Sequence, residues 1–222
     1  MSPVTVDLPS SPLGDVDPRF EELALDVAAS TFGLPGTSVR EKLLQNLTMD
    51  VCRSHFGLAF RMHITAAKMH GLTYADLLAA LRFIAPYSGY PAVAEALARL
   101  KEIATEIGMD TSDLGAEPTA GAVGDGVARV EATDEWTAEF LDRQLALAWS
   151  EDRLSMRERA IMALTSDVGQ QALGESFCGH IEFALRVGLS ADGVRDVVRF
   201  CAEHGVARAL AALGELDKVM ST

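Results

Sequence analysis

The sequence contains one stretch twice, and this internal repeat limits the possible folds more than any other feature. Residues 60–72 return 117 positions later as residues 177–189, without a gap. In the same register, residues 38–85 and 155–202 are identical at 17 of 48 positions, and the identical residues include His, Phe, Gly and Asp. Chance similarity between two Ala- and Leu-rich segments gives far fewer matches. The chain is therefore predicted to consist of two copies of one structural unit.

Both copies carry the signals of a helical unit. Ser38 and Glu41 have the spacing of a capping box, in which the two side chains bind free backbone N–H groups at a helix start. Ser155 and Glu158 repeat this spacing in the second copy. Gly71, followed closely by a threonine, predicts a tight turn between two antiparallel helices. The sequence thus predicts an all-α fold without strands, made of two tandem pseudo-symmetric helical repeats. The expected helices are 17–32, 38–52, 57–70, 74–85 and 91–107 in the first copy, and 135–149, 156–171, 175–187, 191–203 and 206–219 in the second.

These expected helices divide the chain into four segments. Residues 1–16 are rich in Pro and Ser and are expected to be a flexible tail, and residues 17–107 form the first repeat. Residues 108–133 are glycine-rich without periodicity and are expected to be a linker, and residues 134–222 form the second repeat. Within the first repeat, the Pro- and Gly-containing residues 86–91 predict a break between the last two helices.

Composition excludes several classes of partner and location. The formal net charge is −13 and there is no Lys/Arg-rich run, so nucleic acid and anionic membrane surfaces are not expected partners. No apolar run approaches the roughly 20 residues of a membrane span. The three cysteines have no metal-site spacing, and the N-terminus lacks the pattern of a secretory signal, which together favour a soluble protein in the reducing cytoplasm.

Several short motifs occur along the two copies, and the His-x-x-x-Ala-x-x-x-Gly-Leu spacing occurs in both. They are residues 149–159, His180 with Ala184 and Gly188-Leu189, His63 with Ala67 and Gly71-Leu-Thr73, and Tyr87-Ser-Gly89-Tyr-Pro91. In these motifs the chain resembles the carboxymuconolactone decarboxylase family, which includes alkyl hydroperoxidase D-like proteins, over most of both repeats. The resemblance implies an all-helical fold that assembles into oligomers, commonly of six repeat units. It also implies active sites that use no cofactor and are lined by helices and subunit contacts.

The sequence departs from this family at positions that carry chemistry. Alkyl hydroperoxidase D-like members have a Cys-x-x-Cys pair before the histidine, and both cysteines are replaced in each copy. The replacements are Phe56 and Ala59 before His63, and Leu173 and Ser176 before His180. A glutamate that the family often has after the turn glycine is Ala79 in the first copy and Asp196 in the second. Thiol redox chemistry of the family type is therefore not expected, and one copy is expected to be degenerate.

The second copy offers a candidate pair for acid/base catalysis. His180 lies eight residues before the turn glycine and Asp196 eight residues after it, so an antiparallel hairpin places both at the same height, roughly 12 Å from the turn. A neighbouring carboxylate orients a histidine ring and raises its pKa. His180 and Asp196 are the predicted catalytic residues, and a purely stabilising pair is the alternative. His63 faces Ala79 in the same argument and is expected to be mainly structural.

Other polar residues near the two hairpins are candidates for substrate binding. They are His204, Tyr87, Arg199, Cys178 and His63. Tyr87 and His204 occupy equivalent positions in the two copies, where each can present a polar group. Arg199 can bind a carboxylate, although its retention as Arg82 in the other copy favours a salt bridge. Cys178 fits a buried small side chain as well as a reactive one.

The leading hypothesis is a decarboxylase-like enzyme that uses no cofactor or metal. It would act on a small carboxylated, lactone-like or polyketide-like substrate by proton transfer through His180, with possible C–C bond cleavage. One alternative is a peroxiredoxin-like thiol protein based on Cys178, and another is a non-catalytic helical oligomer that binds a ligand. A homo-oligomer is expected, most simply a trimer, because three two-repeat chains supply six units.

Overall fold

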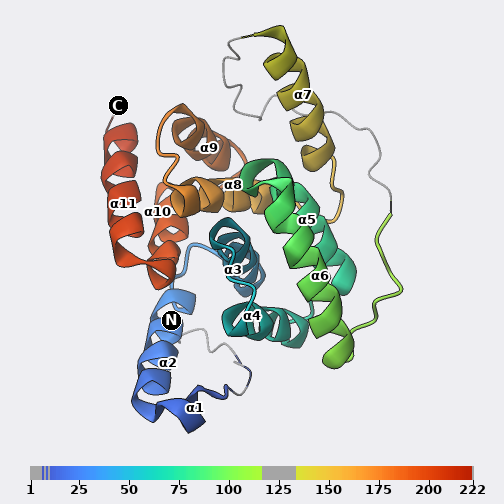
Figure 1. Cartoon of the computed structure of the whole chain (residues 1–222). Coiled ribbons are helices and arrows are strands. Elements are labelled where there is room, and N and C mark those ends of the chain that lie inside the picture. The colour runs from blue at the N-terminus through green and yellow to red at the C-terminus, as the bar shows by residue number, and fades with distance from the viewer. Residues whose placement is uncertain (1–6, 8, 10, 117–133, 222) are drawn as a thin grey trace.

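The computed structural model describes Asp7, Pro9 and residues 11–116 and 134–221, and within these residues the protein is all-α without strands (Figure 1). The predicted fold class is confirmed. The helices are α1 (Leu13–Val16), α2 (Pro18–Phe32), α3 (Val39–Arg53), α4 (Leu58–Met69), α5 (Tyr74–Ser88), α6 (Tyr90–Glu106), α7 (Glu135–Trp149), α8 (Met156–Gln170), α9 (Glu175–Arg186), α10 (Ala191–Phe200), the 3₁₀ helix η1 (Cys201–His204) and α11 (Val206–Met220).

The helix boundaries repeat in the register of 117 residues. Helices α2, α3 and α4 correspond exactly in their first and last residues to α7, α8 and α9. The single helix α5 corresponds to α10 together with η1, and α6 corresponds to α11, which begins one residue earlier in this register and ends three residues earlier. The predicted capping boxes of α3 and α8 are present, with Glu41 and Glu158 each accepting a bond from the N-cap backbone. Each half of the chain therefore builds the same sequence of helices.

The centre of the molecule is the contact between α3 and α8. Two ion pairs cross it reciprocally: Arg40 Nε lies 2.6 Å from Glu158 Oε1, and Arg157 Nε lies 2.6 Å from Glu41 Oε1. Each carboxylate that caps its own helix thus also binds an arginine of the other repeat. The helices also approach closely at Gly169, where an added Cβ would lie 2.9 Å from the sulfur of Met49. The two repeats consequently share one core.

A buried cation closes the carboxyl end of α2, and another closes that of α7. The ammonium group of Lys42 donates to the carbonyl of Phe32 at 2.7 Å and to that of Leu34 at 2.5 Å. Arg159, the equivalent residue, donates to the carbonyls of Trp149 and Glu151. The last carbonyls of a helix have no partner within it, so a cation placed there satisfies them and favours the helix dipole. These contacts attach α2 and α7 to the central helices.

Two boundaries differ from those expected. Helix α5 continues through Pro86 and ends at Ser88, and the chain turns only at Gly89, which has a φ of +93° that suits glycine. The proline is tolerated because only the last helical turn lies beyond it. Part of the expected N-terminal tail forms the one-turn helix α1. Residues 117–133 of the expected linker lie outside the described residues.

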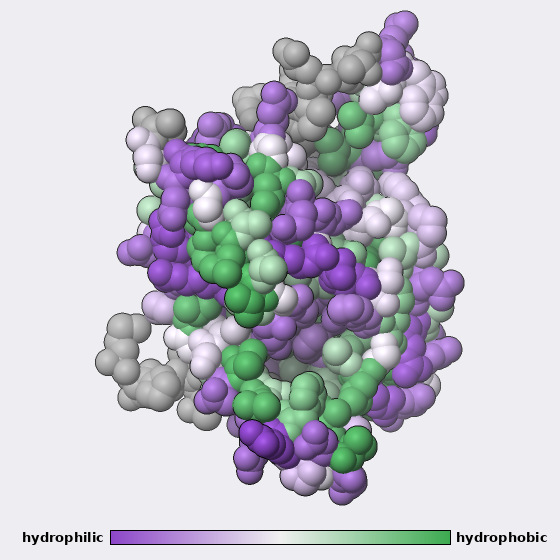
Figure 2. All heavy atoms as spheres, turned by 60° about the vertical axis from the view of Figure 1, so that its left-hand side comes forward, coloured by the Kyte–Doolittle hydropathy of each residue, from purple (hydrophilic) through white to green (hydrophobic). Residues whose placement is uncertain are grey.

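Apolar side chains remain exposed on the outer helices. Figure 2 shows them as separate green groups between hydrophilic areas on one face of the molecule. The most exposed large apolar residues include Phe20 and Leu23 of α2, at 54% and 58%, and Trp136 of α7, at 70%. Of the helices that the structure describes, none has both the length and the apolar character that crossing a bilayer requires.

Candidate functional site

Each repeat holds a histidine against a buried aspartate. In the first repeat, Nδ1 of His63 on α4 lies 2.6 Å from Oδ2 of Asp50 on α3, and the Asp50 side chain is fully buried while His63 is 17% exposed. In the second repeat, Nδ1 of His180 on α9 lies 2.6 Å from Oδ2 of Asp167 on α8. A carboxylate at Nδ1 fixes the tautomer and leaves Nε2 as the reactive nitrogen. Both repeats therefore contain an oriented histidine.

The expected pairing of His180 with Asp196 is not formed. Asp196 accepts a hydrogen bond from the backbone N–H of Gly36 at 3.0 Å and another from Arg199 at 2.9 Å. The two residues share a height on the hairpin, but His180 faces α8 rather than α10. The comparison of His63 with Ala79 also gave a wrong result. It suggested that His63 has no carboxylate partner, but Asp50 on α3 is its partner. The identity of Asp50 and Asp167 in the two copies was the signal that could have found both pairs.

Each histidine meets a ring from the opposite repeat. The ring centroid of His63 lies 6.1 Å from that of His204, and the ring centroid of His180 lies 5.7 Å from that of Tyr87. Positions 87 and 204 are equivalent in the two copies. In both sites, therefore, the repeat that lacks the histidine contributes the ring at this position. Both sites are therefore composite, and neither is complete within one repeat.

His204 positions an amide in the first site. Its Nε2 lies 3.0 Å from Oδ1 of Asn46 on α3. Burial lowers the pKa of His204 to about 3, with further lowering by the positive charges of His63 and His55, so its ring is neutral at neutral pH. A neutral ring with its proton on Nε2 donates to the amide oxygen of Asn46. The amide nitrogen of Asn46 then keeps two N–H groups for other partners.

A carboxyl group from the second repeat stands beside His63. Glu203 of η1 accepts a hydrogen bond at 3.0 Å from the hydroxyl of Thr31, and burial raises the pKa of its carboxyl. For His63, burial lowers the pKa, but the hydrogen bond and charge of Asp50, aided by the charge of Glu203, outweigh burial and raise it. The first site thus combines a histidine that holds its proton and a carboxyl that binds one more readily than usual.

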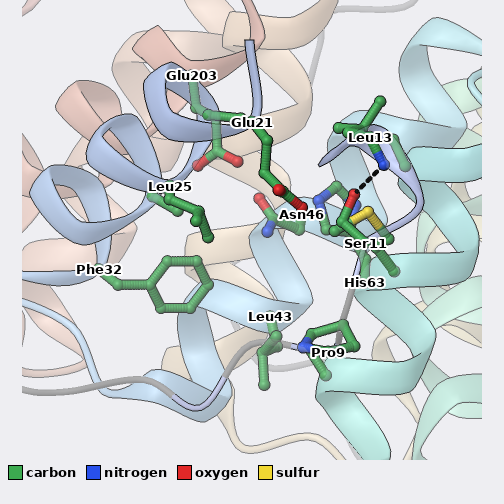
Figure 3. A pocket seen from close by; sticks show the side chains of 15 residues that line it. Pro9, Ser11, Leu13, Glu21, Leu25, Phe32, Leu43, Asn46, His63 and Glu203 are labelled. Atoms are coloured by element: carbon green, nitrogen blue, oxygen red, sulfur yellow. Dashed lines mark hydrogen bonds between the residues drawn. The ribbon is translucent and has the colours of Figure 1, made fainter. Parts of the chain in front are cut away.

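A cavity of about 190 Å³ opens beside His63 (Figure 3). Most of its wall is apolar, and the polar groups are those of His63, Asn46, Glu203, Glu21 and Ser11. The apolar lining residues are Pro9, Leu13, Ala24, Leu25, Ala28, Phe32, Leu43, Ala59, Met62 and Ala66. In Figure 3, Phe32, Leu25 and Glu203 lie on the left side, and Ser11, Leu13 and His63 lie on the right. The cavity has the character of a small-molecule site: mostly apolar, with a few convergent polar groups.

The second site is more deeply buried than the first. Tyr87 accepts a hydrogen bond at 2.9 Å from Nε1 of Trp149, and burial raises the pKa of its hydroxyl. Ser176 donates to the second oxygen of Asp167 at 3.0 Å, and His180 is only 2% exposed. The positions equivalent to Glu203 and Asn46 are Pro86 and Ala163. The second site therefore lacks the groups that surround His63.

The remaining candidates lie apart from the cavity. The Arg199 side chain is half exposed and forms a salt bridge with Asp196. Cys178 is two residues from His180 on α9, so the two side chains leave the helix in different directions. Burial raises the pKa of the Cys52 and Cys201 thiols, which disfavours reactive thiolates there. The described part of the chain contains no cluster of three or more His, Cys, Asp or Glu residues suited to a metal ion.

Comparison with known proteins finds a match for part of the chain. The model of the carboxymuconolactone decarboxylase family matches residues 18–102, which include α2 to α5 and most of α6. His63 and Asp50 lie inside the matched segment, whereas His204 and Glu203 lie outside it. A search of curated proteins finds no match.

Proposed function

We propose that the cavity beside His63 is the active site of a decarboxylase-like enzyme that works without a cofactor, and the match of residues 18–102 to the carboxymuconolactone decarboxylase family model supports this. The observation that carries the proposal is a histidine oriented by Asp50 on the wall of a mostly apolar cavity. This choice differs from the expectation that the second repeat is the active one, and it is supported by the burial of His180.

The chemistry follows from the charge states around His63. Loss of CO₂ from a carboxylate leaves the electron pair of the broken C–C bond on the substrate, where a conjugated carbonyl takes it up as an enolate. Protonated His63 then donates its Nε2 proton to the substrate carbon and regains a proton from water. The amide N–H groups of Asn46 can stabilise the enolate oxygen. No oxidant or reductant is required, and the same groups also suit a simple proton shift next to a carbonyl.

Glu203 is suited to complete the proton transfer. Burial raises the pKa of its carboxyl and so favours the protonated form more than in water, and Glu203 lines the same cavity as His63. A proton held by Glu203 can therefore be passed to a leaving oxygen of the substrate or to the substrate carbon that His63 also faces. Since Glu203 and His204 come from η1, the second repeat supports catalysis by the first.

A paired substitution tests the assignment. His63→Gln and His180→Gln are compared with the native protein on a set of small β-keto acids and carboxylated lactones, with CO₂ release and hydrogen exchange at carbon as readouts. We expect His63→Gln to lower kcat/KM by about 100-fold or more and His180→Gln to affect mainly the melting temperature. Activity that survives in His63→Gln but disappears in a folded His180→Gln protein would assign the reaction to the second repeat.

We also propose that the protein works as a homo-oligomer, with a trimer as the simplest form. The exposed apolar residues of α2 and α7 support this, because both helices leave one face uncovered. Light scattering at micromolar concentration tests the proposal, and a monomer would contradict it. The three free cysteines support the further proposal of a reducing cytoplasmic location.

A further inference from the structure

The size and charge of the cavity restrict which molecules it can hold, and this inference rests on the function proposed above. We propose that the site takes a ring-sized, largely apolar molecule that carries no more than one negative charge. Its polar group lies at the end formed by His63 and Asn46, and its apolar body lies against Phe32. A dicarboxylate is rejected by the glutamates that line the same space.

The volume sets the size of the ligand. An apolar protein cavity of about 150 Å³ is large enough to bind benzene. The cavity beside His63 measures about 190 Å³, so it accommodates one six-membered ring with one or two small substituents. A two-ring compound exceeds this space unless the wall moves.

The walls determine the polarity of the ligand. Phe32, Leu43 and Met62 come from three different helices and face one space, with small alanines between them. Burying polar groups against such walls without hydrogen bonds is unfavourable. Among the polar lining groups, His63 and the amide of Asn46 can donate hydrogen bonds to a carbonyl or carboxylate of the ligand, whereas Glu21 and Glu203 are carboxyl groups. A ligand with a single polar end matches this division.

The charges determine how many carboxylates the ligand can carry. Two glutamates, Glu21 and Glu203, line the cavity, whereas no lysine or arginine appears among its described lining residues. The positive charge of His63 is already matched by Asp50 at 2.6 Å. The nearby ammonium group of Lys42 is bound to two backbone carbonyls. One carboxylate can be held by His63, but a second one would face a glutamate without a compensating cation.

The test compares two ligands for which charge and size predict opposite orders of affinity. Phthalate is a dianion, and its monomethyl ester is larger but carries a single charge. Calorimetry on the native protein should give at least tenfold tighter binding of the ester, and the neutral probe acetophenone should also bind. In the double variant Glu21→Gln with Glu203→Gln, phthalate binding should improve at least tenfold while acetophenone binding stays within threefold.

A second pair of variants locates the binding. Ala24→Trp places a large ring in the cavity and should abolish binding of both the ester and acetophenone, whereas Ala29→Trp, on an exposed part of the same helix, should not. Phthalate that binds as tightly as its ester, binding that survives Ala24→Trp, or no binding of either preferred probe at millimolar concentration would each overturn the inference. Because these are binding measurements, an inactive protein that binds the ester refutes only the proposed reaction. If the protein turns over a dicarboxylate and this activity depends on His63, the proposed limit on ligand charge is refuted, but the proposed reaction is not.

Discussion

The rings of His63 and His204 lie 6.1 Å apart across the boundary between the repeats, and the protein stabilises opposite charge states on them. Asp50 favours the protonated form of His63, whose pKa is raised, while burial and the charge of His63 hold the pKa of His204 at about 3. Protonation of both rings at once is thus strongly disfavoured. The ring that is held neutral is the one that orients Asn46, and the ring whose protonated form is favoured is the one that meets the cavity.

Replacing His204 should change the pH dependence of stability. The folded-state pKa of about 3 lies below the ordinary value of 6.5, so the unfolded chain binds a proton first as the pH falls. The stabilising contribution of neutral His204 is present above pH 6.5 and is lost progressively between pH 6.5 and 3. In His204→Gln, which keeps a donor for Asn46, the urea midpoint should fall less steeply between pH 7 and 5 than in the native protein. His70→Gln serves as the control and should keep the native slope.

Removing the charge of Asp50 should reduce activity more than stability explains. In Asp50→Asn the amide no longer favours the protonated imidazole of His63, so the apparent pKa of activity should fall and kcat/KM at neutral pH should drop by about 100-fold. Asp167→Asn makes the same change in the closed site and should leave kcat/KM within a few fold. Equal losses of activity in the two variants would contradict a specific role for Asp50.

A serine at position 59 should stabilise the protein. Oδ1 of Asp50 is buried without a hydrogen-bond partner among the described residues, whereas Oδ1 of Asp167 accepts a bond from Ser176. Ala59 occupies the position of that serine in the first repeat. Ala59→Ser should therefore raise the free energy of unfolding by about 1 to 2 kcal/mol, and Ser176→Ala should lower it by a similar amount. Denaturant unfolding measures both, and a destabilised Ala59→Ser protein would show that the added hydroxyl does not reach Asp50.

The buried cation of the first repeat should be important for stability. Lys42→Met keeps the length of the side chain but leaves the carbonyls of Phe32 and Leu34 without their donor. The expected loss is about 1 to 3 kcal/mol of unfolding free energy. Lys68→Met, which alters an exposed lysine that donates to the carbonyl of Ile107, should cost less than 1 kcal/mol. Similar losses in the two variants would refute the special role of Lys42.

Local signals were sufficient to predict the helices other than the one-turn helix α1. The capping boxes at Ser38 and Ser155 mark helix starts through contacts within four residues, and the repeat transfers each boundary to the other copy. Pro86 misled the prediction because a proline near the end of a helix removes little of its hydrogen bonding, so the helix runs on to Ser88. Elements defined by short-range chemistry were therefore recognised, with small errors at their ends.

The candidate site was harder to predict because it depends on helix rotation and on contacts between repeats. The prediction for His180 compared distances from the turn along α9 and α10. Such distances do not show that the face of α9 that carries His180 is turned toward α8 rather than α10. The wall of the cavity also includes Pro9, from a segment that was expected to be a tail. No spacing rule relates that segment, or Glu203 of the other repeat, to His63.

The exchange of side chains between the two composite sites has a consequence for how the chain can vary. The second repeat has a closed site of its own, yet it contributes Glu203 and His204 to the open one. Substitutions there can alter the reaction without touching the segment that holds His63 and Asp50. Cutting the chain into its two halves would separate each histidine from the ring that it meets in the opposite repeat, so neither half would hold a finished site and the duplicated unit has become indivisible.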